Sequence, residues 1–198
     1  MREGPEGSGD HIVRADMTFD RDRLVEAFGY LGADLAGRGL FVELAVYGGS
    51  ALMLQFSWRR GTEDVDAVLR PGYDERALAP SVSHVAEIMG LPGDWLNDAV
   101  GMFTPLDEHE TLFRASGHFP SDGTPGLRVL VAKPHYLLAM KLLALGNVNR
   151  GDRDMTDARA LANELGIDDM ETLGRLYASI HGEAPAHDLR AQFPSVLG

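Results

Sequence analysis

Two short motifs in the sequence carry residue types that could handle a phosphate group and a divalent cation. Gly48-Gly49-Ser50 closes an apolar run, and Asp64-Val65-Asp66 opens a second run. Glycines let the backbone approach a ligand, and the helix expected after them directs unpaired N–H groups, together with the Ser50 hydroxyl, toward an anion. A strand would place both carboxylates of the second motif on one face, where they can bind magnesium. Together the motifs predict transfer of a nucleotidyl group.

The elements that must position these motifs follow from the spacing of apolar residues. A helix is predicted over Asp20–Arg38, and a strand over Phe41–Val46 leads into the glycines. A second helix, Ser50–Ser57, is expected directly after them. Asp64–Leu69 alternates like a strand, and Glu75–Met89 has the spacing of another helix. The motifs therefore stand in the order strand, turn, helix, loop and strand.

The rest of the chain is predicted to add two strands and then only helices. Asp94 could cap a short helix through Trp95–Asn97, with Trp95 in the core and Asn97 as a candidate site-lining residue. Thr111–Ala115 and Leu127–Val131 are expected strands. From Lys133 onward no further strand is expected. The predicted helices there cover 134–145, 152–165 and 169–180, with a short segment from residue 185.

These elements indicate an α/β (α+β) protein with a small mixed sheet flanked by helices. We expect a flexible tail over residues 1–18, a core over 19–131 and a C-terminal helical region over 132–198 that packs on the core. With 198 residues the chain can bury a substantial core.

Composition excludes several classes of protein. The net charge of −12 argues against a broad duplex-binding surface, whereas a triphosphate that carries its own magnesium meets less repulsion. No cysteine is present, which excludes disulfides and thiolate metal sites. The chain start lacks the order of a secretory signal, and no apolar run is long enough for a membrane span. We therefore expect a cytoplasmic protein with no membrane association.

The motifs and their surroundings resemble a known superfamily. Gly49-Ser50 followed by Asp64-X-Asp66 is similar to the signature of the polymerase-beta-like nucleotidyltransferases, at the minimal end of that fold. Residues 60–66 resemble the Arg-X-Thr-X-Asp-hydrophobic-Asp run of bacterial nucleotidyltransferases in the AbiEii-like group, and residues 136–144 and 153–157 resemble later parts of that group. Many members are toxins of toxin–antitoxin pairs, and characterised relatives add nucleotides to the acceptor end of transfer RNA. The resemblance thus implies a nucleoside triphosphate, an RNA acceptor and an antitoxin protein as partners.

The resemblance also implies roles for particular residues. Gly48-Gly49-Ser50 would contact the triphosphate, and Asp64 and Asp66 would bind magnesium or manganese. Lys141 would reach the triphosphate, and Asp154 would be the later acidic residue of the site. In this scheme the catalytic residues are the Asp pair, Lys141 and Asp154.

Other residues of these runs are candidates for the same site. Arg60 and Thr62 are predicted to bind nucleotide. Lys141 is the one charge in an apolar helix, so it needs a partner such as phosphate or carboxylate. Asp154 and Asp157 share a face of the next predicted helix, and either could approach Lys141; the motif favours Asp154.

The sequence departs from the superfamily pattern at one point, and each motif also has a purely structural explanation. Many superfamily members carry a third metal-binding carboxylate on a later core strand, and Leu127–Val131 has no acidic residue. Either Asp154 substitutes for it or metal binding is weakened. Gly48-Gly49-Ser50 could be a tight turn, the Asp pair an exposed strand face, and Lys141 could extend to solvent. The alternative function is a degenerate nucleotidyltransferase fold that binds nucleotide or protein without catalysis.

Overall fold

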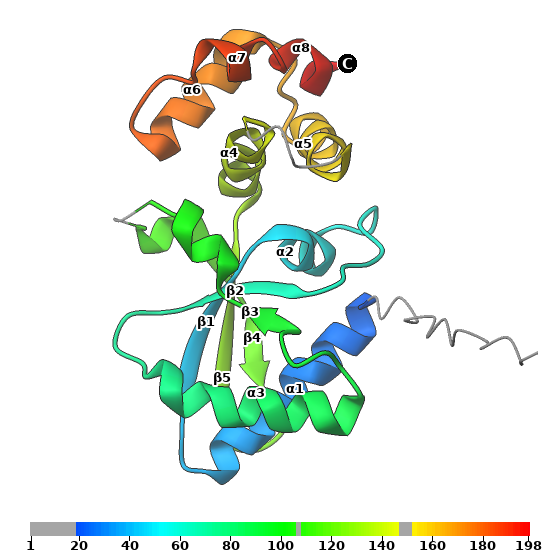
Figure 1. Cartoon of the computed structure of the whole chain (residues 1–198), viewed down its shortest axis with the longest axis vertical. Coiled ribbons are helices and arrows are strands. Elements are labelled where there is room, and N and C mark those ends of the chain that lie inside the picture. Colours follow the sequence, from blue (N-terminus) through cyan, green and yellow to red (C-terminus); the bar gives the residue numbers. More distant parts are fainter. Residues whose placement is uncertain (1–18, 106–107, 147–151) are drawn as a thin grey trace, which may run out of the picture.

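A computed structural model describes residues 19–105, 108–146 and 152–198 of the chain, and the predicted tail over residues 1–18 lies outside this part. The sheet occupies one part of the molecule, and the helices that follow the last strand gather at the opposite end (Figure 1). Within the described ranges, none of the helices combines the length and the apolar character that a membrane crossing requires.

One mixed sheet of five strands forms the centre of the fold. The strands are β1 (Val42–Val46), β2 (Val65–Leu69), β3 (Leu96–Asn97), β4 (Phe113–Phe119) and β5 (Leu127–Ala132). Their order is β3-β2-β1-β5-β4. β1 runs antiparallel to β2 and parallel to β5, β2 runs parallel to β3, and β4 runs antiparallel to β5. The predicted mixed α/β class with a small mixed sheet is therefore confirmed.

Two long amphipathic helices accompany the sheet at positions that the sequence predicted. α1 (Arg21–Gly37) begins after Asp20, whose carboxylate accepts a hydrogen bond of 2.8 Å from the Arg23 N–H. α3 (Glu75–Met89) is capped by Asp74 and ends at Gly90, which adopts a left-handed backbone with φ of 61°. α1 packs against β4 and β5 and also contacts α3 and α2.

The glycine motif starts a helix, as the sequence predicted, although the helix begins earlier. α2 (Gly48–Gln55) includes both glycines, with Tyr47 as its N-terminal cap residue. Tyr47 directly follows β1, and its N–H donates to the Asp66 carbonyl at 2.9 Å. The end of β1 and the Asp motif of β2 are thereby held side by side.

The predicted short helix over Trp95–Asn97 is wrong. Leu96 and Asn97 form β3 and pair with Val65 and Asp66 of β2. The side chain of Trp95 is buried, and its carbonyl accepts a 2.7 Å hydrogen bond from the Val65 N–H. Because the unpaired edge of β2 needs hydrogen-bond partners, it draws this segment into the sheet, and a 3-10 helix, η1 (Ala99–Phe103), follows.

The strand predicted over Thr111–Ala115 is displaced toward the C-terminus. A 3-10 turn, η2 (Glu110–Leu112), comes first, and β4 then pairs with β5 from Phe113 to Phe119. β4 is longer than predicted because this pairing continues through the polar residues of the strand, past an irregularity between Ala115 and Gly117.

Beyond β5 the described residues form only helices and their connections, as predicted. The helices are α4 (Pro134–Leu145), α5 (Asp152–Glu164), α6 (Met170–His181), α7 (His187–Arg190) and α8 (Phe193–Leu197). α4 buries most of its surface and carries Lys141 as its one lysine or arginine. It contacts α5, α6 and α7, and therefore forms the centre of this helical group (Figure 1).

Candidate functional site

The first glycine of the motif brings the backbone directly against a carboxylate. Gly48 has a φ of 56°, a left-handed conformation that favours glycine. A Cβ atom at this position would lie 2.3 Å from Oδ2 of Asp66. A Cβ at Gly49 would lie 2.8 Å from Oγ1 of Thr62 and 2.9 Å from Nη2 of Arg59. Both positions therefore require glycine for close approach, the first to Asp66 and the second to the loop that precedes β2.

The hydroxyl groups of the two motifs are bonded to the protein backbone. Ser50 Oγ donates to the main-chain carbonyl of Asp64 at 2.8 Å, and Thr62 Oγ1 donates to the same carbonyl at 3.1 Å. Both residues are buried, with Ser50 only 1% exposed. Ser50 and Thr62 therefore fix the backbone that carries the Asp pair, a role that the sequence did not indicate.

The Asp pair has the alternation that the sequence predicted. Val65 is fully buried, whereas Asp64 and Asp66 are partly exposed on either side of it. Asn97 on the neighbouring strand β3 donates from Nδ2 to Oδ2 of Asp64 at 3.0 Å. Its Oδ1 accepts a 3.1 Å hydrogen bond from the Ala99 N–H, which orients the amide. Asn97 thus holds one oxygen of Asp64 in place.

This arrangement bears on the expected third carboxylate. The strand expected to carry it, residues 127–131, belongs to β5, which pairs with β1 and not with β2; the neighbour of β2 on its other side is β3, whose residue next to Asp66 is the amide Asn97. In the described part of the chain no group of three or more His, Cys, Asp or Glu side chains is arranged to hold a metal ion. Magnesium commonly binds through one or two protein carboxylates, with substrate phosphates and water completing its shell. The donor set of Asp64 and Asp66 fits that mode of binding.

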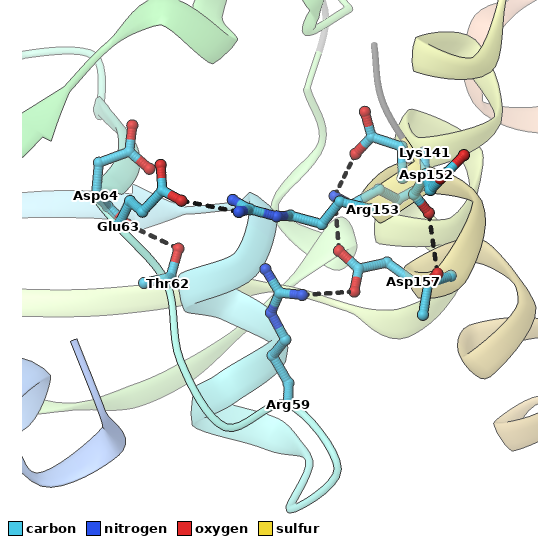
Figure 2. A network of polar contacts seen from close by, with 10 residues as sticks. Arg59, Thr62, Glu63, Asp64, Lys141, Asp152, Arg153 and Asp157 are labelled. Atoms are coloured by element: carbon cyan, nitrogen blue, oxygen red, sulfur yellow. Dashed lines mark hydrogen bonds and ion pairs between the residues drawn. The ribbon is translucent and has the colours of Figure 1, made fainter. Parts of the chain in front are cut away.

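Lys141 lies in a small cluster of buried charges (Figure 2). Its Nζ is 2.6 Å from Oδ1 of Asp154 and 2.9 Å from Oδ2 of Asp157. Asp157, whose side chain is 1% exposed, also pairs with Nη1 of Arg59 at 3.0 Å. The sequence favoured Asp154 as the partner of Lys141, and both carboxylates contact it. We call these four residues the lysine cluster.

A second, exposed contact joins the same two regions. Arg153 Nη2 on α5 lies 2.8 Å from Oε1 of Glu63, just before the Asp pair. The hydrogen bond and charge of Arg153 lower the pKa of the Glu63 carboxyl, and the Glu63 carboxylate raises the pKa of Arg153. Figure 2 shows this pair beside the lysine cluster. Arg60, predicted to bind nucleotide, is exposed and does not line the cleft described next, whereas its neighbour Arg59 enters the cluster.

Four of the predicted site residues line one cleft of about 680 Å³. They are Gly48, Asp66, Lys141 and Asp154, which come from α2, β2, α4 and α5. Asp64 does not line this cleft; its side chain is held by Asn97 beside β2. The remaining walls are mainly apolar side chains of η1, α4 and the segment that leads into α7. The volume lies in the range of small-molecule sites, about 300–1,000 Å³.

A second, largely buried charge lies near the start of α2, and no motif in the sequence indicates it. Glu108 accepts hydrogen bonds from the hydroxyls of Tyr47, at 2.7 Å, and Tyr136, and it pairs with Nη1 of Arg70 at 3.1 Å. The Arg70 guanidinium also lies over the ring of Phe113, 4.9 Å from its centre. Burial is the largest cause that raises the pKa of Tyr47, and the charge of Glu108 and the hydrogen bond to it raise this pKa further. Burial and the hydrogen bond between Tyr136 and Glu108 likewise raise the pKa of Tyr136. We call these five residues the glutamate cluster.

Comparison with known proteins gave no match: no family model fits the chain, and neither a curated protein nor a solved structure matches it. Function is therefore argued from the motifs and from the geometry of the site.

Proposed function

We propose that this protein is a metal-dependent nucleotidyltransferase, which moves a nucleoside monophosphate from a nucleoside triphosphate to an acceptor hydroxyl. The observation that most supports the proposal is the single cleft lined by Gly48, Asp66, Lys141 and Asp154. These residues are far apart in the sequence and supply a close backbone approach, a cation ligand and a positive charge, all of which a triphosphate requires. The finer fold assignment, a minimal nucleotidyltransferase fold with a packed C-terminal helical region, is part of this proposal.

In the proposed reaction, each residue acts at a stated place. The backbone at the start of α2 binds triphosphate oxygens, with Asp66 directly beside it. Asp64 and Asp66 would hold magnesium or manganese, which when bound neutralises phosphate charge and polarises the reacting groups. The acceptor hydroxyl attacks the alpha phosphorus and gives up its proton to solvent, the bond from that phosphorus to the oxygen between the alpha and beta phosphates breaks, and pyrophosphate leaves.

Lys141 contributes a positive charge that the protein keeps in position. Asp154 and Asp157 hold its Nζ at 2.6 and 2.9 Å, so the charge is oriented before a ligand arrives. In the proposed complex Nζ exchanges one carboxylate for a triphosphate oxygen, while Arg59 continues to compensate Asp157. Such preorganised charges are among the larger contributions to catalysis.

The resemblance and the net charge of the protein bear on which acceptor it uses. The resemblance to the AbiEii-like group favours RNA, in particular transfer RNA, and suggests a toxin with an antitoxin partner. The net charge of −12 favours an acceptor with a small contact surface, so a protein or small-molecule hydroxyl remains an alternative acceptor.

A second candidate function rests on Asn97. β5 carries no acidic residue and β3 offers an amide beside Asp66, so the predicted site has two metal-binding carboxylates where many members of the superfamily that the motif resembles have three. A degenerate fold that binds nucleotide or a protein partner without transfer would be consistent with this difference.

One experiment separates the two candidates. The purified protein is incubated with each nucleoside triphosphate labelled at the alpha phosphate, with magnesium and total cellular RNA. We expect label on an RNA band or on a protein, and its loss in the Asp64→Ala/Asp66→Ala double variant. Nucleotide binding without label transfer to any acceptor would favour the binding module instead.

A further inference from the structure

Two polar side chains line the cleft apart from the groups that would handle the triphosphate. Tyr177 of α6 and Glu183, in the segment between α6 and α7, belong to the wall of the same cavity as Asp66 and Lys141. Tyr177 is only 5% exposed, and its hydroxyl makes no hydrogen bond with any residue in the described ranges. A tyrosine on the wall of a cavity whose hydroxyl has no protein partner can offer that hydroxyl to a ligand as donor or acceptor.

The two residues are electrostatically close to each other. Burial raises the pKa of the Tyr177 phenol, and the charge of Glu183 raises it further. The ring of Tyr177 is fixed from its other side by His181, whose ring centre lies 4.4 Å away and whose Nε2 is 3.1 Å from the Ala139 carbonyl. The hydroxyl of Tyr177 is thus presented by a ring that packing holds in place.

The surroundings of this pair suit a flat, largely apolar group. Phe103 and Val100 of η1 and Leu137 and Met140 of α4 contribute apolar side chains to the cavity. On α4, Leu137 and Lys141 are one turn apart and share a face, so the charged group and the apolar wall belong to one surface. Nucleobases are commonly held between apolar side chains and read by hydrogen bonds to their polar edge.

We propose that Tyr177 and Glu183 recognise the nucleobase of the donor triphosphate and favour bases that carry an exocyclic amino group. An ionised carboxylate only accepts hydrogen bonds, so Glu183 pairs with the exocyclic amino group at C4 of cytosine or C6 of adenine. Uracil and hypoxanthine present a carbonyl at the same position and would face the carboxylate oxygen to oxygen. The Tyr177 hydroxyl donates to a ring nitrogen or carbonyl of the same edge. This inference rests on the proposed function, because the triphosphate end of the cleft fixes where the base lies.

The test compares triphosphates that differ in this one feature. Calorimetry with magnesium measures CTP against UTP and ATP against inosine triphosphate. Wild-type protein is expected to bind the amino-bearing member of each pair about tenfold more tightly, a difference typical of one hydrogen bond to a charged group that is partly open to solvent. Glu183→Gln offers both a donor and an acceptor and is expected to bring both ratios close to one. Tyr177→Phe is expected to weaken all four ligands.

A matched control is Glu87→Gln, which removes an exposed carboxylate of α3 outside the cleft and should keep both ratios. Equal binding within each pair by wild-type protein, or ratios unchanged in Glu183→Gln, would overturn the inference. If label transfer from the alpha phosphate is still observed in that case, the proposed function stands without base recognition by Tyr177 and Glu183. No binding of any of the four triphosphates would overturn the nucleotide site itself and the inference with it.

Discussion

The molecule contains two clusters of buried charge that are built in different ways. In the glutamate cluster, Glu108 is surrounded by two phenols and one guanidinium that itself lies against an aromatic ring. In the lysine cluster, Lys141 contacts two carboxylates and shares one of them, Asp157, with Arg59, and Lys141 and Asp154 both line the cleft. The first cluster joins the residues directly after β1 and β2 to β4 and α4, and the second joins α4 and α5 to the loop before β2.

The difference separates a structural role from a functional one. Two phenols and a guanidinium satisfy the Glu108 carboxylate, and none of the five residues lines the cleft. A satisfied polar network of this kind makes its local structure rigid. In the lysine cluster the charges can exchange partners, because an anion in the cleft can replace a carboxylate at Lys141. Variants of the first cluster should therefore change stability, and variants of the second should change activity.

The largest effect is expected from Glu108→Ala. The substitution leaves the Arg70 guanidinium and two buried phenols without their shared acceptor, which should lower the free energy of unfolding by about 3–5 kcal/mol. Chemical denaturation measures this change. Glu110→Ala, an exposed carboxylate two residues away, is the control and should change stability by less than about 0.5 kcal/mol. Similar values for the two variants would contradict the structural role of the glutamate cluster.

Lys141→Met should lose activity and keep most of its stability. The side chain keeps its apolar stem but loses the charge, so transfer from the alpha-labelled triphosphate should fall by about 10²–10³-fold. Folding should be largely kept, because Asp157 retains Arg59 and Asp154 has access to the cleft. Lys133→Met changes the other lysine of the chain, which lies outside the cleft, and should retain activity. Full activity of Lys141→Met would remove Lys141 from the site.

Asn97→Ala tests how Asp64 is positioned. Without the 3.0 Å hydrogen bond the carboxylate can rotate, and the magnesium concentration that gives half-maximal transfer should rise about 10-fold or more. The rate at saturating magnesium should change much less, which distinguishes positioning from a direct chemical role. Ala99→Gly keeps the Asn97 side chain, its hydrogen bond to Asp64 and the backbone N–H of residue 99. This variant should therefore keep the wild-type magnesium requirement. A lower rate with an unchanged magnesium requirement would argue against this role.

The smallest effect concerns alkaline pH. The pKa of Tyr47 is raised in the folded protein, so the unfolded chain loses this proton first and stability should fall as the pH rises above about 10. Tyr47→Phe removes this group and should reduce the slope of that decline, at a loss of about 1–2 kcal/mol at neutral pH. Thermal unfolding between pH 7 and pH 11 measures both the loss at neutral pH and the slope of the alkaline decline. An equally steep alkaline decline in the variant would contradict the burial of an un-ionised Tyr47.

The sequence predicted what depends on local pattern and missed what depends on distant partners. α1 and α3 follow from apolar spacing and capping residues, and the start of α2 follows from its glycines. β3 was predicted as a helix because its conformation depends on the edge of β2, a segment 31 residues earlier in register. Glu108 gave no signal because its partners are 28 to 61 residues away in the chain.

The candidate site shows the same limit. The glycines, the Asp pair and Lys141 could be proposed from motifs, and Gly48, Asp66 and Lys141 line one cleft whereas Gly49 and Asp64 do not. The contacts of Ser50 and Thr62 with the Asp64 carbonyl could not be foreseen, because they require the loop before β2 to fold back on α2. The motif predicts a site role for Arg60, but in the structure its neighbour Arg59 pairs with Asp157. The sequence alone does not show which of two adjacent arginines turns inward.

The most direct test of nucleotidyl transfer follows both ends of the triphosphate in parallel reactions. One reaction carries the label at the alpha phosphate and the other at the gamma phosphate, each with magnesium, total RNA and wild-type or Asp66→Asn protein. We predict that the alpha label moves to an acceptor, that an equal amount of gamma label appears in pyrophosphate, and that Asp66→Asn loses both. Gamma label on the acceptor, or no transfer by a folded protein that binds triphosphate, would contradict the proposal.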